Sequence, residues 1–187
     1  MAERVFPASM GWWLVNPLRK LALNPRRLLG AHIKPGMTVL EPGCGMGFFS
    51  LPAARLAGPQ GRVICVDLQA GMIAGLQKRA AQAGLSDRIE LRVCAADSLR
   101  IGDLQGKVDF AFAVAVVHEV PDDGRFFREI GQALKPGGRL LFIEPKGHVT
   151  AEAFEASLGR AKENGLAAIG TADIAKRTAL LGKAGKN

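Results

Sequence analysis

The stretch Thr38-Val39-Leu40-Glu41-Pro42-Gly43-Cys44-Gly45-Met46-Gly47-Phe48-Phe49 decides the fold of this chain. A β-branched and aliphatic run ends in an acidic residue, three glycines follow at alternate positions, and an apolar stretch at helical spacing comes next. Glycine suits such a loop because it adopts positive φ freely and lets a ligand approach the backbone. The pattern predicts a strand, a tight glycine loop and a helix that together bring bare backbone N–H groups to a ligand.

Length and composition indicate an ordinary globular domain. At 187 residues the chain is long enough to bury a core, and its shares of hydrophobic residues, 48%, and charged residues, 22%, are typical of a soluble protein. No apolar run approaches the roughly 20 residues that span a bilayer. The first ten residues contain Glu3, Arg4 and Pro7 and lack an apolar signal core, so we expect no secretion and a cytoplasmic location.

The three cysteines, Cys44, Cys65 and Cys94, fall in or beside predicted buried strands. No C-x-x-C spacing occurs, so the sequence indicates neither a zinc site nor a disulfide framework, and we predict no bound metal. Reduced thiols agree with the cytoplasmic location expected from the N-terminus.

The formal net charge is +8, with a denser basic group between Arg19 and Lys34. Such a charge favours an anionic partner such as RNA or a membrane surface. A solvated basic surface is the plainer interpretation, because basic residues occur along the whole chain and no basic stretch is interleaved with aromatics. A nucleic-acid partner is therefore an alternative that the sequence does not favour.

Residues 1–35 differ from the rest of the chain. Prolines punctuate this segment, two of them after asparagine, and both tryptophans, Trp12 and Trp13, lie here. Asn-Pro steps favour turns and helix starts, and the leucines between them have a partly helical spacing. We therefore predict that residues 1–35 form two or three short helices. These helices would act as a lid across the opening of a main domain that covers residues 36–187.

From Gly36 onward, segments with strand and helix character alternate. Strands are expected at residues 38–41, 63–67, 89–94, 110–117 and 139–144, helices at 48–56, 71–83, 121–134 and 151–164, a turn at 135–138, and a terminal hairpin from 167–170 and 174–181. The strands are nearly continuous apolar runs, as expected when both faces of a parallel sheet are covered. Their alternation with helices predicts an α/β fold with a doubly wound sheet.

Chemistry-bearing side chains follow the predicted strands at their carboxyl ends. The glycine loop ends the first strand, Asp67 ends the second, Asp97 follows the third and His118 ends the fourth. Open parallel sheets bind ligands at this edge, where the winding direction changes. Asp67 also lies twenty positions after Gly47, the separation at which an acidic residue accepts hydrogen bonds from ribose hydroxyls. These positions predict a cofactor that contains a nucleoside.

Glu41 narrows the identity of the cofactor. A dinucleotide site usually has the spacing G-x-G-x-x-G, with a pyrophosphate on the helix N-terminus. Here the glycines alternate at Gly43, Gly45 and Gly47, and the carboxylate of Glu41 precedes them. A carboxylate would repel a pyrophosphate and would attract an ammonium group. The stretch therefore favours S-adenosyl-L-methionine, which carries an ammonium at its methionine end and a sulfonium cation.

Five segments together resemble the class I S-adenosylmethionine-dependent methyltransferases. They are Val39–Gly47, Val66-Asp67-Leu68, Ala96-Asp97-Ser98, the run from Val108 to His118, and Leu134-Lys135-Pro136-Gly137-Gly138-Arg139-Leu140. The likeness extends over residues 36–181. It implies a Rossmann-like sheet of seven mostly parallel strands in the order 3-2-1-4-5-7-6, with strand seven antiparallel, and S-adenosyl-L-methionine as the cofactor.

The resemblance also implies that eight residues bind the cofactor. The methionine end would be contacted by Glu41, Gly43, Gly45 and the backbone of Val114, the ribose hydroxyls by Asp67, and the adenine by Leu68, Asp97 and Ser98. Glu41 stands where the family more commonly has aspartate, and the longer side chain keeps the negative charge.

His118 is the candidate catalytic base. Methyl transfer from a sulfonium is an in-line displacement that depends on alignment and a dry site, and it needs a base only when the acceptor must lose a proton. Imidazole has an unperturbed pKa of about 6.5, which suits a base at neutral pH. The alternative for His118 is a capping role at the strand end, and a structural role is expected for Glu119.

The absence of certain motifs excludes some classes of methyl acceptor. No Asn-Pro-Pro-aromatic motif follows the fourth predicted strand, and the sequence contains no Pro-Cys dipeptide. These absences argue against the usual adenine-amino and cytosine-C5 nucleic-acid enzymes, and too few exposed thiols are expected for arsenite methylation. We predict methyl transfer to a small-molecule acceptor, with RNA or protein methylation and a non-catalytic cofactor-binding domain as alternatives.

Overall fold

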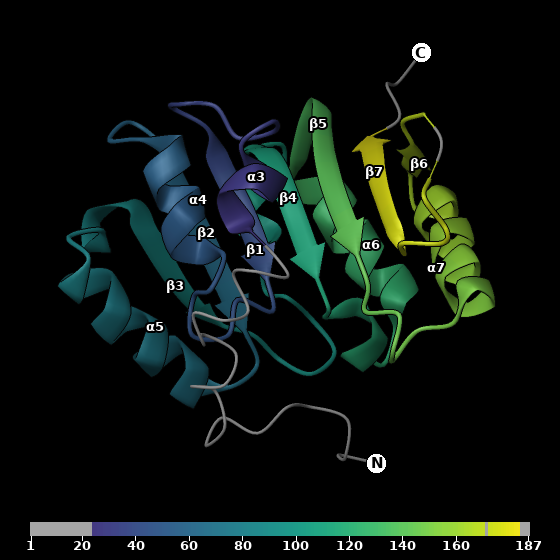
Figure 1. Ribbon diagram of the computed structural model, residues 1–187, viewed down its shortest axis with the longest axis horizontal. Helices are drawn as coiled ribbons and strands as arrows, with labels where there is room; N and C mark the ends of the chain where they lie inside the picture. Colours follow the sequence, from purple (N-terminus) through teal and green to yellow (C-terminus); the bar gives the residue numbers. More distant parts are fainter. Residues whose placement is uncertain (1–23, 171, 184–187) are drawn as a thin grey trace. The chain divides into compact units, whose positions relative to one another are not determined.

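The structure is a computed structural model that describes residues 24–170 and 172–183 (Figure 1). Seven strands form one sheet in the order β3-β2-β1-β4-β5-β7-β6, and β7 runs antiparallel to β5 and β6. The strands are β1 Thr38–Pro42, β2 Arg62–Asp67, β3 Ile89–Val93, β4 Val108–Val114, β5 Leu134–Ile143, β6 Leu166–Ala168 and β7 Thr178–Lys183. This architecture confirms the predicted fold class and strand order.

Helices alternate with the strands up to β5. They are α3 Pro25–Leu29, α4 Ser50–Ala57, α5 Ala70–Gln82, α6 Asp123–Ala133 and α7 Ala151–Glu163, with the 3₁₀ turns η2 Ser86–Arg88, η3 Gly102–Leu104 and η4 Val117–Glu119. The four predicted helices of the main domain are confirmed to within two residues at each end. α6 begins late because Asp122 is its N-cap, and the Asp122 carboxylate accepts the backbone N–H of Arg125 at 2.9 Å.

The predicted lid over residues 1–35 lies largely outside the described residues, and so do both tryptophans. Its described end contains α3. There Pro25 occupies the first turn, and the Asn24 side chain accepts the backbone N–H of Arg27 at 3.2 Å. The Asn-Pro step therefore starts a helix, which agrees with the sequence pattern.

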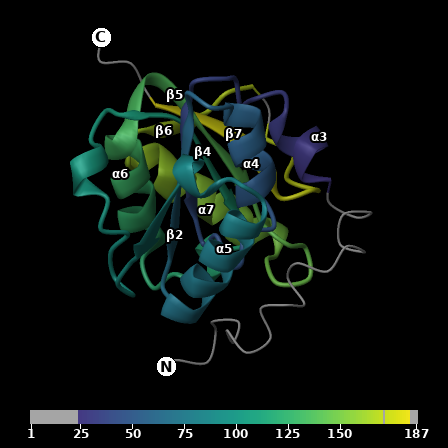
Figure 2. The same cartoon turned by 90° about the vertical axis from the view of Figure 1, so that its left-hand side faces the viewer.

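Cys94 ends the first of two compact units, and Ala95 begins the second. In the first unit, β2 pairs in parallel with β1 on one side and with β3 on the other. α4 packs on β1 and β2, and α5, nearest the viewer in Figure 2, packs on β2 and β3. Val39–Pro42 of β1 and Val63–Asp67 of β2 are buried without interruption, as predicted for strands covered on both faces.

The second unit contains β4 to β7. β4 pairs in parallel with β5, and α6 packs on β5 and on α7. Phenylalanines from three elements form its centre: the rings of Phe127 and Phe142 lie 5.4 Å apart, and those of Phe142 and Phe154 lie 4.9 Å apart. All three side chains are fully buried, so this cluster holds α6 and α7 to the sheet.

The segment Lys135–Gly138 was predicted as a turn before the fifth strand, and this prediction is wrong. β5 already begins at Leu134, which pairs with Val108, whereas the next pair joins Arg139 to Phe110. The surplus residues on β5 form an irregularity inside the strand, where Gly137 has φ +74°. The strand pairing resumes after this irregularity because Leu134, which precedes it, is buried and pairs with Val108.

The terminal hairpin is confirmed, but its second strand starts later than predicted. β7 begins at Thr178 rather than at residue 174, because residues 174–177 form a turn that Asp173 and Thr178 close. In that turn the Asp173 carbonyl accepts the Thr178 N–H at 3.0 Å, and the Asp173 carboxylate accepts the Lys176 N–H at 2.9 Å. Before the hairpin, Gly165 has φ +82° and ends α7 as predicted.

Candidate functional site

The glycine loop connects β1 to α4 in the first unit. Gly43, Gly45 and Gly47 all have positive φ, at +70°, +51° and +82°. The backbone N–H groups of Gly43 and Cys44 both donate to the Val66 carbonyl, at 2.8 and 3.2 Å. Left-handed conformations at three alternate positions explain why glycine recurs there, since a Cβ disfavours them.

Asp67 at the end of β2 holds this loop. Its Oδ2 accepts the backbone N–H of Gly45 at 2.8 Å, and its Oδ1 accepts that of Gln69 at 2.9 Å. The side chain is only 9% exposed, and burial raises the pKa of Asp67 while the backbone hydrogen bonds oppose that rise. The residue predicted to bind ribose thus joins the loop after β1 to the turn after β2. Leu68, predicted to flank adenine, follows it and is 39% exposed.

Glu41 is buried beneath the glycine loop, with 3% of its surface exposed. Its Oε2 accepts the hydroxyl of Ser50 at 2.5 Å and lies 3.9 Å from the Cys65 thiol. Burial raises the pKa of Glu41 to about 8, against the lowering effect of the Ser50 hydrogen bond. The carboxyl group is therefore mainly protonated at neutral pH when no cation is nearby, which the sequence did not predict. A cation placed beside it would restore the charge.

The second unit supplies the end of β4. The Ala115 N–H donates to the Ile143 carbonyl at 2.9 Å, and Ala115 then takes the left-handed φ of +58°. This turn ends the strand at Val114, three residues before the predicted end, and leads into the 3₁₀ turn η4. Non-glycine residues seldom adopt such a φ, so a specific interaction must hold the chain there.

That interaction comes from Glu144, directly after β5. Its Oε1 accepts the backbone N–H groups of Val117, at 2.8 Å, and His118, at 3.3 Å. Its Oε2 lies 2.5 Å from Nδ1 of His118. The Glu144 carboxyl is 3% exposed, and its two oxygens face three nitrogen atoms, of which two are backbone N–H donors. His118 Nδ1 therefore donates to Glu144, which leaves Nε2 of the imidazole as the atom able to accept a proton.

Sequence reasoning found His118 but missed Glu144 and His148. The His148 ring lies 5.5 Å from the His118 ring, and His148 itself is exposed in the segment after β5. The available signal was the position of Glu144, an acidic residue at the carboxyl end of a predicted strand, the same signal that singled out Asp67.

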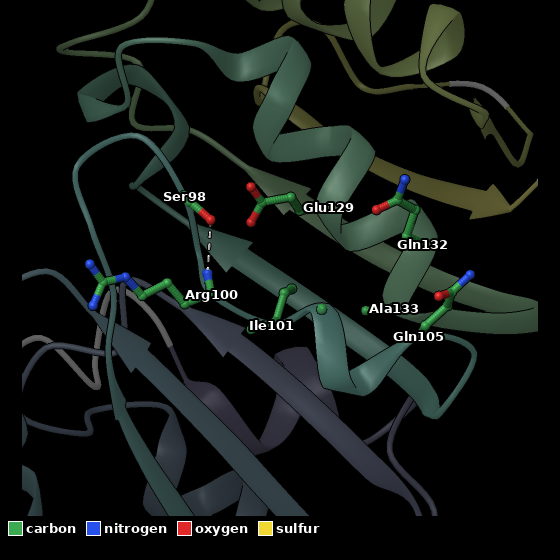
Figure 3. A pocket seen from close by; sticks show the side chains of 8 residues that line it. Ser98, Arg100, Ile101, Gln105, Glu129, Gln132 and Ala133 are labelled. Atoms are coloured by element: carbon green, nitrogen blue, oxygen red, sulfur yellow. Dashed lines mark hydrogen bonds between the residues drawn. The ribbon is translucent and has the colours of Figure 1, made fainter.

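Asp97 and Ser98 lie in the segment after β3. The Asp97 carboxylate is 75% exposed and lies 3.5 Å from Nη1 of Arg125 on α6. The Ser98 hydroxyl accepts the backbone N–H of Arg100 at 3.1 Å (Figure 3). Ser98 also lines an open hollow of about 250 Å³ between this segment and α6, whose other lining residues are Arg100, Ile101, Gly102, Gln105, Glu129, Gln132 and Ala133.

The chemistry of these donors suits S-adenosyl-L-methionine. The glycine loop gives close backbone approach, Asp67 gives a carboxylate beside it, and the buried carboxyl of Glu41 can balance a cation. Among the described residues no cluster of histidine, cysteine and acidic side chains forms a metal site, and none of the three cysteines lies in a disulfide. None of the described helices is long and apolar enough to cross a membrane.

Comparison with curated proteins gives methyltransferases. Over 115 residues the chain is 35% identical to a demethylmenaquinone methyltransferase of Symbiobacterium thermophilum, covering 60% of this chain and 44% of the relative. It is 34% identical over 149 residues to a ubiquinone biosynthesis O-methyltransferase of Caulobacter vibrioides, covering 71% and 56%. An arsenite methyltransferase of Halobacterium salinarum is 33% identical over 121 residues, covering 65% and 30%. The chain therefore spans about half or less of the length of these relatives.

Comparison with solved structures supports the same fold. A SAM-dependent methyltransferase from Aquifex aeolicus superposes with a TM-score of 0.82 at 22% identity, covering 95% of this chain and 98% of that one. Residues 33–181 match a family described as a methyltransferase domain. The predicted resemblance and cofactor are thereby confirmed. The chain belongs to the class I S-adenosylmethionine-dependent methyltransferases.

Proposed function

We propose that this protein transfers the methyl group of S-adenosyl-L-methionine to a hydroxyl oxygen of a small molecule, with His118 as the base. The observation that carries the proposal is the 2.5 Å contact between His118 Nδ1 and the buried Glu144 carboxylate. A hydrogen bond of this kind fixes the tautomer and the orientation of an imidazole, so that its second nitrogen is free to accept a proton.

The His118–Glu144 pair provides the base that an acceptor hydroxyl needs. A hydroxyl is a weak nucleophile at neutral pH, and it becomes a strong one when a base removes its proton during attack. When bound, the cofactor would supply a methyl group on a sulfonium sulfur. The acceptor oxygen would attack that methyl carbon in line, so that a carbon–oxygen bond forms as the carbon–sulfur bond breaks and the thioether S-adenosylhomocysteine leaves. His118 Nε2 takes the hydroxyl proton, and the Glu144 carboxylate stabilises the imidazolium that results. His148, exposed and in contact with His118, lies where that proton can pass to solvent.

We propose cofactor roles for the predicted residues as well. The glycine loop would take the methionine end with help from Glu41 and the Val114 carbonyl, Asp67 the ribose, and Leu68, Asp97 and Ser98 the adenine. The geometry within the first unit supports the first two roles, because Asp67 and Gly45 share a hydrogen bond at the loop. The N-terminal segment over residues 1–35 would close over the acceptor.

The names of the relatives support a small-molecule acceptor. Two of them act in the methylation steps of demethylmenaquinone and of ubiquinone biosynthesis, the second by O-methylation. The arsenite methyltransferase supports a different acceptor, but Cys44 and Cys65 are buried here and Cys65 is completely so. Buried thiols cannot meet an arsenic oxyanion from solvent, so a hydroxyl acceptor agrees better with the described residues.

The test is a transfer assay with S-adenosyl-L-methionine labelled at its methyl group. Phenols, catechols and reduced quinones are offered beside amines, carboxylic acids and arsenite, and the product is identified by mass spectrometry. The matched variant is His118→Asn, whose amide can still donate to Glu144 but which lacks a proton-accepting nitrogen. We expect O-methylated product from the wild-type chain and a loss of about 10²-fold or more in rate for the variant.

Other outcomes separate the alternatives. Label on amine products, or an unchanged rate in His118→Asn, contradicts the role of His118 as a base. Transfer to RNA or protein, with binding that weakens steeply as salt rises, points to a macromolecular acceptor. Calorimetric binding of the cofactor without transfer to any acceptor of the panel supports a non-catalytic domain.

A further inference from the structure

Arg79 on α5 contacts the glycine loop, although it belongs to none of the sequence segments that resemble the cofactor-binding motifs. Its Nη1 donates to the backbone carbonyl of Met46. The side chain is partly buried, and burial lowers the pKa of the Arg79 guanidinium. Within the described residues no carboxylate forms an ion pair with it, so the Met46 carbonyl is its principal polar contact. A partly buried cation that faces a carbonyl and no acid requires a structural or functional reason.

The bonded carbonyl belongs to the peptide group between Met46 and Gly47. The N–H of the same peptide, on Gly47, donates to the Cys44 carbonyl at 3.0 Å. Arg79 and Cys44 therefore fix the two ends of one peptide group. Fixing this peptide matters, because glycine populates positive and negative φ about equally and an adjoining peptide can flip at low cost.

Helix α5 also supports the loop by close packing. A Cβ added to Gly75 would lie 2.9 Å from Cγ of Met46, and one added to Gly47 would lie 2.3 Å from Cδ1 of Leu76. The helix and the loop thus touch without space between them, and Arg79 adds a polar contact. α5 begins three residues after Asp67, so the strand end and the helix both position the loop.

We infer that Arg79 is a positioning residue for cofactor binding: it locks the Met46–Gly47 peptide so that the glycine loop keeps the conformation that receives S-adenosyl-L-methionine. The inference depends on the cofactor and not on the hydroxyl acceptor proposed above. Cofactor-binding measurements therefore test it even if the acceptor or the role of His118 is different.

The experiment compares Arg79→Met, Arg79→Lys and Lys78→Met in the full chain. Lys78 is the matched control, because it is the preceding residue on α5, carries the same charge and is exposed. Calorimetric titration with S-adenosyl-L-methionine and with S-adenosylhomocysteine should give about tenfold weaker binding of both ligands for Arg79→Met, the change expected from one charge-assisted hydrogen bond. Arg79→Lys keeps a donor and should remain within about threefold of wild type.

A spectroscopic readout separates positioning from general destabilisation. The amide nitrogen of Gly47 shares the peptide whose carbonyl Arg79 binds, so its NMR signal should shift or broaden in Arg79→Met and return toward the wild-type position in Arg79→Lys. Three results would overturn the inference: wild-type affinity in Arg79→Met, an equal loss in Lys78→Met, or no recovery in Arg79→Lys. If Arg79→Met does not fold, the affinity and Gly47 signal of Arg79→Lys decide the question alone.

Discussion

The carboxylate of Asp67 accepts the backbone N–H of Gly45 at 2.8 Å, across the end of the pair formed by β1 and β2. The sequence predicted each of these residues as a contact of the cofactor, but not as a contact of each other. One acidic side chain therefore fixes the position of the loop, as a preorganised binding site requires.

Replacing Asp67 should weaken cofactor binding more than it weakens the fold. Asp67→Ala removes both backbone hydrogen bonds, leaves the Gly45 N–H without its partner, and should cost about 1–3 kcal/mol of unfolding free energy. Asp67→Asn should cost less, because its amide oxygen can still accept one bond. Both variants should lose roughly 10²-fold or more in cofactor affinity by calorimetry while circular dichroism shows a folded chain. Unchanged binding in Asp67→Ala would contradict the site.

Glu41 should make stability fall as pH rises. The pKa of Glu41 is raised by burial from 4.5 to about 8, so between those values the unfolded chain releases a proton that the folded chain keeps. Stability is then full below pH 4.5 and declines toward pH 8, by an amount on the order of a few kcal/mol. Glu41→Gln keeps an acceptor for the Ser50 hydroxyl and cannot ionise, so this part of the pH dependence should disappear.

The measurement for Glu41 is thermal unfolding of wild type and Glu41→Gln from pH 5 to 8.5. The variant should gain stability relative to wild type as pH increases. Glu155→Gln, a change at an exposed position on α7, is the control and should keep the wild-type slope. A constant difference between wild type and Glu41→Gln over this range would show that Glu41 is ionised throughout.

Glu144 should matter to catalysis through His118. In Glu144→Gln the amide oxygen can still accept the N–H groups of Val117 and His118, but the amide nitrogen then faces Nδ1. The imidazole must place its proton on Nε2 to accept from that nitrogen, so it can no longer act as a base. We expect the methylation rate to fall roughly 10²-fold with little change in melting temperature.

Two companion measurements distinguish this role from a purely structural one. Glu144→Ala removes all three hydrogen bonds, so it should also unfold at a lower temperature, by an amount that matches about 1–3 kcal/mol. Cofactor affinity should stay near wild type in Glu144→Gln, and the exposed control Glu163→Gln should change nothing. A wild-type rate in Glu144→Gln would leave His118 without the proposed partner.

Gly47→Ala should lower the free energy of unfolding more than Gly84→Ala, although both glycines have positive φ. Gly47 has φ +82°, and an added Cβ would lie 2.3 Å from Leu76, whereas Gly84 has φ +63° with nothing within 4 Å. Gly84→Ala thus isolates the cost of the left-handed conformation, about 1–2 kcal/mol. Gly47→Ala adds overpacking and should cost about 1–3 kcal/mol more in urea unfolding. Equal losses would mean that α5 and the loop separate freely.

Much of the fold could be predicted from local sequence. The apolar runs, the glycine stops and the strand-end acids follow from rules that act over a few residues, and they gave the alternation of strands and helices and the places of Gly45 and Asp67 after β1 and at the end of β2. The strand order followed from the resemblance to the methyltransferases. The segment Lys135–Gly138 shows the limit of such rules. Its residues favour a turn locally, but pairing with β4 on both sides keeps it within β5. Long-range pairing decided the outcome there.

The chemistry of the site depended more on distant contacts. Glu144 lies 26 residues after His118, and no local pattern relates them. Glu41 was predicted as a charge, but its protonation follows from complete burial and from Ser50, nine residues on. A residue's type and spacing were enough to identify it as a candidate, whereas its charge state and its partner required the folded chain.

Ala115 gives the turn after β4 a stored strain. Its φ of +58° costs about 1–3 kcal/mol in a residue with a Cβ, and the chain remains there because Glu144 accepts the backbone N–H groups of Val117 and His118, two and three residues further on. The orientation of His118 is therefore the result of two opposing forces rather than of a relaxed backbone. Ala115→Gly would remove the backbone strain and leave the hydrogen bonds to Glu144 unchanged. The His118 ring would then sample a wider range of orientations, although every polar group of the site is still present. A histidine that acts as the proposed base would be aimed more tightly with alanine than with glycine at position 115, although glycine fits the backbone better.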